Sequence, residues 1–164
     1  MMFEHILVPI DGSSLSALAL PVAADLARRY GSSLTLLYVV PPPVVVYAES
    51  AYVYDGAEES ARARAEGQRI LEDARDSLDH PDVQLVRLDD ADPRTAQAIA
   101  DEVVRQGASL VVMSSHGRTG LEHFFLGSVA EGVMRRVDVP VLLVRQPKTS
   151  PTRTKHPAAQ EAGR

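Results

Sequence analysis

Short apolar segments alternate with longer amphipathic segments along this chain, and the alternation limits the folds that it can adopt. Residues 34–40 (LTLLYVV) form a β-prone run that is too apolar to expose one face to solvent. Such a run is typical of a parallel strand that other elements cover on both sides. Shorter runs of similar character predict further strands at residues 3–10, 83–88, 110–113 and 141–144.

The segments between these runs have the spacing of amphipathic helices. Over residues 15–30, apolar side chains recur at steps of three and four, and Gly31 is placed to end the helix. Pro21 lies inside this segment, where its missing backbone N–H is expected to bend the helix. Asp92-Pro93 predicts a helix start, because an N-cap residue is followed by proline. We expect the other helices over residues 57–78, 93–106 and 129–137, and leave residues 44–54 unassigned.

The order of these elements predicts an α/β fold. Strands that alternate with helices favour right-handed crossovers and a parallel sheet of five strands with helices on both faces. We expect one domain over residues 1–145 and a disordered basic tail over residues 146–164, which lack periodicity. Ligands of such sheets bind at the carboxyl ends of the strands, where the strand order reverses. That rule selects the turns at residues 11–13 and 114–128.

Charge and composition exclude several classes of function. The net charge is −5, and the tail has four basic residues against one acidic residue, which leaves −8 for residues 1–145. We do not expect such an acidic body to bind nucleic acid. Without cysteine, the chain forms no disulfide and no thiolate zinc site. No apolar run approaches the ~20 residues of a membrane span. The start MMFEH lacks the basic region of a secretory signal, so we expect a cytoplasmic protein.

The turn at residues 114–128 carries the strongest signal for a binding site. Its glycines, Gly117, Gly120 and Gly127, allow positive φ angles and close approach, so that backbone amides can converge on an anion. Gly127-Ser128 stands at the start of a predicted helix, whose first N–H groups attract phosphate. The chain contains neither a Walker sequence nor G-x-G-x-x-G, so the spacing alone is a weak signal.

Several of these residues also have a purely structural interpretation. The S-x-x-E sequence at residues 128–131 has the spacing of a capping box, in which the serine caps the helix and the glutamate reaches back. Asp11, which a glycine follows, equally suits a turn or a helix cap. His116 and Arg118 either donate to a phosphate or stay solvated in the loop. The residue types leave these alternatives open.

Both ends of the chain's first 145 residues resemble the universal stress protein family. HILVPIDGSSLSALAL is similar to the beginning of that family, and VVMSSHGRTGLEHFFLGSVAEGVMRRVDVPVLLVR is similar to its end. The family's nucleotide motif, G-x2-G-x9-G-[ST], is matched at Gly117, Gly127 and Ser128, whereas Ser114 stands in place of the first glycine. The resemblance implies a Rossmann-like open sheet of order 3-2-1-4-5, ATP binding in a subset of members, and dimers that often pair their last strands.

The resemblance also implies which residues would contact an adenine nucleotide. Asp11 would meet the ribose, and Val39 would lie near the adenine. The expected contacts are Pro9, Ile10, Asp11, Val39, Met113, Ser114, His116, Gly117, Arg118, Gly127, Ser128 and Val129. If the two turns face each other, Asp11 and Ser128 would share Mg²⁺ with bound ATP.

The sequence favours binding over catalysis. ATP hydrolysis needs a base that orients water and usually a metal, and no second acidic residue is placed convincingly beside Asp11. We therefore expect a nucleotide-binding regulator in the stress response that is at most a weak ATPase. The alternatives are a true hydrolase and a ligand-free dimeric interaction module, which Ser114 would permit. In a homodimer the last strands would pair through Val141, Leu142, Leu143 and Val144.

Overall fold

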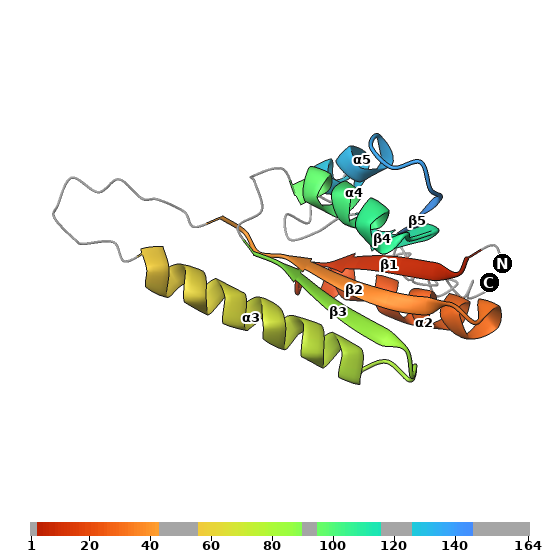
Figure 1. The fold of residues 1–164 in the computed structure, drawn as a ribbon, viewed down its shortest axis with the longest axis horizontal. Coiled ribbons are helices and arrows are strands. Elements are labelled where there is room, and N and C mark those ends of the chain that lie inside the picture. Colours follow the sequence, from red (N-terminus) through yellow and green to blue (C-terminus); the bar gives the residue numbers. More distant parts are fainter. Residues whose placement is uncertain (1–2, 43–55, 90–94, 116–125, 146–164) are drawn as a thin grey trace, which may run out of the picture.

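The core of the protein is a parallel sheet whose strands lie in the order β3-β2-β1-β4-β5. The computed structural model describes residues 3–42, 56–89, 95–115 and 126–145. Its strands, all paired in parallel, are β1 (His5–Ile10), β2 (Ser33–Val39), β3 (Val83–Leu88), β4 (Leu110–Ser114) and β5 (Val141–Val144). The predicted α/β class, sheet and strand order are confirmed (Figure 1).

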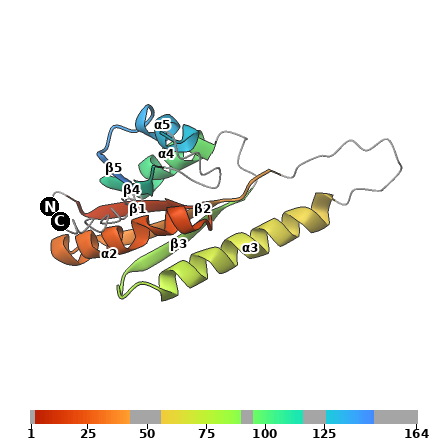
Figure 2. The same cartoon turned by 180° about the vertical axis from the view of Figure 1, so that it is seen from behind.

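Helices cover both faces of this sheet. On one face lie α1 (Ser14–Ala17), α2 (Ala19–Tyr30) and α3 (Gly56–Asp76), and on the other lie α4 (Thr95–Gln106) and α5 (Ser128–Met134), as Figures 1 and 2 show. Successive residues of a strand point to opposite faces. Accordingly, Ile6 and Val8 of β1 belong to the core under α2 and α3, whereas Leu7 belongs to the core under α4 and α5. The continuous apolar runs are therefore explained by burial on both faces.

The first helical segment differs from its expected form. One bent helix was predicted over residues 15–30, but the structure has two helices with a break at Leu18. Ser13 caps α1 by accepting a hydrogen bond from the Ser16 amide at 3.1 Å. Pro21 has no N–H to bond the Ala17 carbonyl, and its ring would clash there. The break places Pro21 in the first turn of α2, where a missing N–H costs little.

Most other helix boundaries follow the sequence closely. Gly31 ends α2 at a φ of 66°, and Gly107, with a φ of 61°, follows α4. The helix expected over residues 129–137 starts one residue earlier and ends at Met134. None of the described helices combines the length and the apolar character that crossing a membrane requires. Residues 44–54, Asp92-Pro93 and the tail at 146–164 lie outside the described structure.

The long helix α3 lies close to the sheet at Gly67. A Cβ atom on Gly67 would meet the Tyr38 ring at 2.6 Å and 2.7 Å, which is closer than real Cβ contacts allow. Arg87 of β3 ties the same stretch of helix to the sheet edge, donating to the Gln68 side chain at 3.3 Å and to the Arg64 carbonyl at 3.4 Å. Beyond this stretch, the first half of α3 extends past the strands (Figure 1).

Replacing Gly67 by alanine tests this close approach. Alanine is a better helix former than glycine by up to ~1 kcal/mol, so an open helix position would gain stability. We expect Gly67→Ala instead to lower the free energy of unfolding by about 1–3 kcal/mol, because the methyl group overpacks against Tyr38. Chemical denaturation measures the change. Asp73→Ala, at an exposed position of α3, is the control and should stay within about 0.5 kcal/mol of wild type. A stabilised Gly67→Ala protein would contradict the contact.

Candidate functional site

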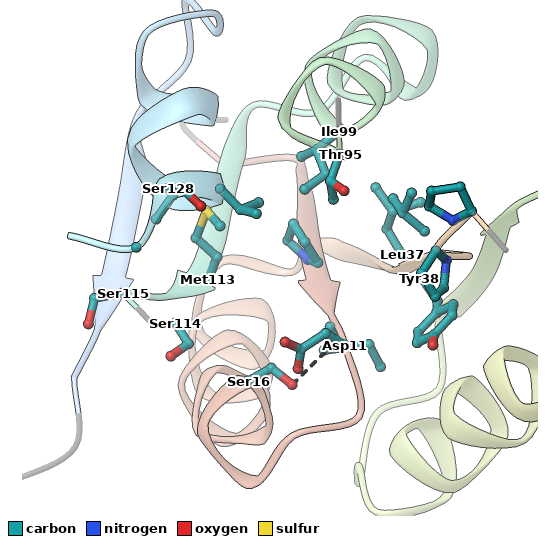
Figure 3. A pocket seen from close by; sticks show the side chains of 18 residues that line it. Asp11, Ser16, Leu37, Tyr38, Thr95, Ile99, Met113, Ser114, Ser115 and Ser128 are labelled. Atoms are coloured by element: carbon teal, nitrogen blue, oxygen red, sulfur yellow. Dashed lines mark hydrogen bonds between the residues drawn. The ribbon is translucent and has the colours of Figure 1, made fainter. Parts of the chain in front are cut away.

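A pocket of about 300 Å³ opens at the carboxyl edge of the sheet. β1 is joined to β2 on one side and pairs with β4 on the other, so the strand order reverses beside β1. This is the position at which open α/β sheets bind ligands. The lining residues, most of which Figure 3 shows as sticks, are Pro9, Ile10, Asp11, Ser16, Leu37, Tyr38, Val39, Pro41, Pro42, Thr95, Ile99, Met113, Ser114, Ser115, Gly127, Ser128, Val129 and Ala130.

The pocket has an apolar side and a polar side. Leu37 and Ile99, with Thr95 beside them, come from β2 and α4. Across the pocket lie the hydroxyl-bearing residues Ser114, Ser115 and Ser128, and Asp11 lies at the exit of β1 (Figure 3). Such a combination, apolar walls with a few placed polar groups, is typical of small-molecule sites.

Asp11 is held in a hydrogen-bonded turn. Its Oδ1 accepts from the Ser13 amide at 2.9 Å, and its own amide donates to the Ser16 hydroxyl at 3.2 Å. The Ser16 hydroxyl donates in turn to the Ser13 carbonyl at 3.0 Å. The turn interpretation of Asp11 is therefore correct, and the same bonds fix the carboxylate at the pocket.

Gly12 allows this turn to form under α3. Its φ is +80°, a left-handed conformation that favours glycine. A Cβ at this position would also meet the Ile70 side chain at 2.6 Å. The positive φ disfavours a larger residue at this position, and the contact shows that Ile70 of α3 packs directly on the turn that carries Asp11.

The turn at residues 114–128 is joined to the sheet through the backbone of Gly127. The Gly127 amide donates to the Ser115 carbonyl at 2.8 Å, and the Ser115 amide donates to the Val144 carbonyl at 3.0 Å. Gly127 has φ −59° and ψ 143°, which any residue can adopt. The expectation that Gly127 supplies a positive φ is therefore wrong, and Gly127 lines the pocket with its backbone. Gly117 and Gly120 lie outside the described residues.

The capping-box interpretation of residues 128–131 is also wrong. Gly127 is the N-cap of α5, and Ser128 is the first helical residue, so the cap position has no side chain that could accept a bond. Glu131 does not reach back, because its carboxylate pairs with Arg135 at 2.6 Å. The Gly127 amide is bonded to the Ser115 carbonyl, so it is not available to the Glu131 side chain, and the N-cap position falls on the glycine, one residue before the serine. Ser128 consequently lines the pocket instead of capping the helix.

The structure brings most of the expected contact residues to this one pocket. Those that line it are Pro9, Ile10, Asp11, Val39, Met113, Ser114, Gly127, Ser128 and Val129. His116, Gly117 and Arg118 lie outside the described structure. The lining also includes Ser16, Thr95 and Ile99, which the sequence analysis did not assign to a site. Ile99 carried only the signal of a helix core position.

The proposed metal ligands, Asp11 and Ser128, both line the pocket. Carboxylate and hydroxyl oxygens suit Mg²⁺, which is usually held by one or two carboxylates together with substrate phosphates and water. Within the described part of the chain, no group of three or more acidic or histidine residues could hold a metal ion by itself. The donor set therefore fits a magnesium ion that arrives with a phosphate ligand.

An open parallel sheet with a pocket at its strand-order reversal defines a Rossmann-like α/β protein. The model of the universal stress protein family matches residues 2–145, and the chain belongs to that family. A universal stress protein of Bacillus subtilis, YxiE, is 34% identical over 152 residues, covering 88% of this chain and 100% of the relative.

Solved structures agree with this assignment. A universal stress protein of Burkholderia pseudomallei is 30% identical, with a TM-score of 0.63, and the match covers 87% of this chain and 96% of that one. A universal stress protein in complex with cAMP has 20% identity and a TM-score of 0.58, covering 88% and 98%. One from Arabidopsis thaliana with AMP bound has 17% identity and a TM-score of 0.56, covering 88% and 92%. The similarity to the last two structures establishes only that this chain shares their fold.

Two substitutions separate the structural role of Asp11 from its charge. Asp11→Ala removes the acceptor for the Ser13 amide, and we expect the free energy of unfolding to fall by about 1 kcal/mol. Asp11→Asn keeps a side-chain oxygen at this position and should stay within about 0.5 kcal/mol of wild type. Denaturation of both variants measures the difference. An equal loss in the two variants would show that the charge, and not the turn bond, stabilises the protein.

Proposed function

We propose that this protein binds an adenine nucleotide, with ATP as the main ligand, and acts as a regulator with slow or no hydrolysis. The observation that carries the proposal is the pocket itself. It gathers Asp11 from one turn and Gly127 and Ser128 from the other at the reversal of strand order. One structurally similar universal stress protein is in complex with cAMP, and another has AMP bound. These two complexes support an adenine nucleotide as the ligand of this chain.

The two sides of the pocket suit the two ends of such a ligand. The apolar side, with Leu37, Val39 and Ile99, offers a surface for a purine ring. On the opposite side, the amides of Ser128 and Val129 precede the first intrahelical bond, which the Glu131 amide makes to the Gly127 carbonyl at 2.9 Å. These early amides have no partner within the helix and suit a phosphate oxygen. Asp11 lies between the two sides, within reach of a ribose or a metal ion.

The same residues offer little for hydrolysis. A catalyst needs a group that orients the attacking water and positive charge that stabilises the transition state. Asp11 is the one acidic residue among the described lining residues, and it already accepts the Ser13 amide. If the protein were a hydrolase, it would release phosphate in a metal-dependent reaction that Asp11→Ala abolishes.

A ligand-free dimeric interaction module is the second candidate, and Ser114 is the observation that favours it. Ser114 lines the pocket and is 9% exposed, where the family motif has glycine. Its side chain takes up room beside the expected path of the nucleotide. If this candidate is correct, wild type binds no ATP and Ser114→Gly restores binding.

Calorimetric titration with ATP tests the proposed function. We expect wild type to bind ATP at or below millimolar concentration, and Gly127→Val to bind at least about tenfold more weakly because its side chain fills the pocket. The φ and ψ of Gly127 suit valine, so backbone strain does not account for a loss. Ala61→Val, at an exposed position of α3, also introduces a valine but away from the pocket, and this variant should bind as wild type does. No binding by wild type, or equal binding by Gly127→Val, would reject the proposal.

We also propose that β5 joins two copies of the chain in a homodimer. β5 is the last strand of the sheet order, so one of its edges has no partner among the described strands. An unpaired edge invites a strand from a second molecule. Val141 and Leu143 pack into the core under α4 and α5, whereas Leu142 is 39% exposed. Leu142 is therefore the residue at which an interface can be tested without damaging the core.

Leu142→Asp should convert the dimer to a monomer, because two aspartates would face each other or lie close across the paired edges. Sedimentation velocity at several protein concentrations measures the oligomeric state. Val104→Asp is the matched control, since Val104 is 81% exposed and belongs to α4, not to the edge strand β5. A Leu142→Asp protein that is folded and still dimeric would count against pairing through β5.

A further inference from the structure

Two helices, α4 and α5, supply separate walls of the pocket. Thr95 and Ile99 belong to the first two turns of α4, and Ser128, Val129 and Ala130 form the beginning of α5. Figure 3 shows Thr95 and Ile99 on one side of the pocket and Ser128 on another. A ligand that fills the pocket contacts both helices, so the distance between the helices determines how well the ligand fits.

The two helices pack against each other at Ala96 of α4 and Gly132 of α5. A Cβ atom on Gly132 would meet the Ala96 Cβ at 2.6 Å, and real Cβ atoms do not approach each other this closely. The Ala96 methyl group cannot turn away, because its carbon is fixed to the backbone. Favourable carbon–carbon contacts are about 3.5–4.0 Å long, so a side chain at position 132 would push the helices apart by about 1 Å. Glycine is a poor helix former, and this contact explains its place inside α5.

Ala96 is the obstacle to a side chain at position 132. Among the described residues, the one other atom within 4 Å of that Cβ position is a guanidinium nitrogen of Arg136, at an ordinary contact distance of 3.5 Å. The same guanidinium links the two helices, because its Nη1 donates to the Gly132 carbonyl at 2.8 Å and its Nε donates to Gln97 Oε1 at 3.1 Å. Gln97 in turn donates from Nε2 to Asp101 at 2.8 Å, which orients its oxygen toward the arginine.

This contact lies next to the pocket without being part of it. Neither Ala96 nor Gly132 is among the described lining residues, yet Ala96 directly follows Thr95, and Gly132 comes two residues after Ala130. Ile99 and Ala130, each 2% exposed, are packed in the same apolar core. Each helix moves largely as a unit, so a change of spacing at the contact moves the pocket walls relative to each other.

We propose that Gly132 is a positioning residue of the pocket: its contact with Ala96 sets the distance between α4 and α5 and thereby fits the two walls to the nucleotide. This inference rests on the proposed function, since it concerns how the same pocket holds its ligand. Gly132 acts through the α5 residues Ser128 and Val129, which line the pocket. When the helices move apart, a nucleotide that stays against the wall of α4 loses its contacts with α5.

Calorimetric titration of Gly132→Ala with ATP, at a temperature at which the variant is folded, tests the proposal. We expect the affinity to fall by about three- to tenfold, because the added methyl group separates the pocket walls. Chemical denaturation of the same protein measures its stability separately. A contact that only stabilised the fold would change the free energy of unfolding and leave the affinity of the folded protein unaltered.

Gly132→Ala/Ala96→Gly is the matched rescue variant. It keeps the new methyl group on α5 and removes the α4 methyl group that would meet it, so the helices can return to their original spacing. We expect this double variant to bind ATP within about twofold of wild type, since the effects of two contacting residues are coupled. Ala96→Gly alone controls for the missing methyl group on α4 and should also bind as wild type does.

Two results would overturn the proposal. One is a folded Gly132→Ala protein that binds ATP as tightly as wild type, and the other is a double variant that binds as weakly as Gly132→Ala. If Gly132→Ala does not fold, the double variant decides, because binding like that of wild type supports the contact and weaker binding overturns it. If wild type binds no ATP, the proposed function itself fails, whereas a failure of the positioning role leaves ATP binding by wild type intact.

Discussion

β1 lies between β2 and β4, and the arrangement of the other elements follows from this central position. Ile6, Leu7 and Val8 are fully buried, because helices cover β1 on both faces. The chain leaves β1 in one direction to form β2 and later returns on its other side as β4. The connections at the carboxyl ends therefore diverge around the exit of β1, and the space between them becomes the pocket.

The groups that line this pocket also hold the fold together. The Asp11 carboxylate accepts the Ser13 amide, and the Ser115 carbonyl accepts the Gly127 amide. The Asp11 turn and the backbone at Gly127 are thus held by the protein's own hydrogen bonds before any ligand arrives, which lowers the ordering cost of binding. It also means that a substitution at either turn changes stability and affinity together. Affinities of such variants are interpretable only beside their free energies of unfolding.

The sequence predicts the strands within two residues because burial on both faces demands uninterrupted apolar runs. Prediction from the sequence fails where an element boundary or a contact depends on residues that are separated along the chain. Pro21 breaks the helix at Leu18, although the apolar periodicity runs through the break. Gly127, and not the following serine, is the N-cap, and its amide bonds to Ser115, twelve positions earlier in sequence, a contact that no local pattern reveals. Ile99 has the spacing of a core residue, and only the packing of α4 over β2 brings it to the pocket.

The charge of the pocket bears on the choice between binding and catalysis. Phosphoryl transfer is accelerated by positive charge and oriented donors that act more strongly on the transition state than on the ground state. The described lining supplies one carboxylate and no positively charged side chain, and the described part of the chain lacks a cluster of three metal ligands. On the proposed function, a Mg²⁺ ion that arrives with the nucleotide would neutralise part of the charge of the bound phosphates. On that proposal, occupancy of the pocket, and not turnover, carries the signal.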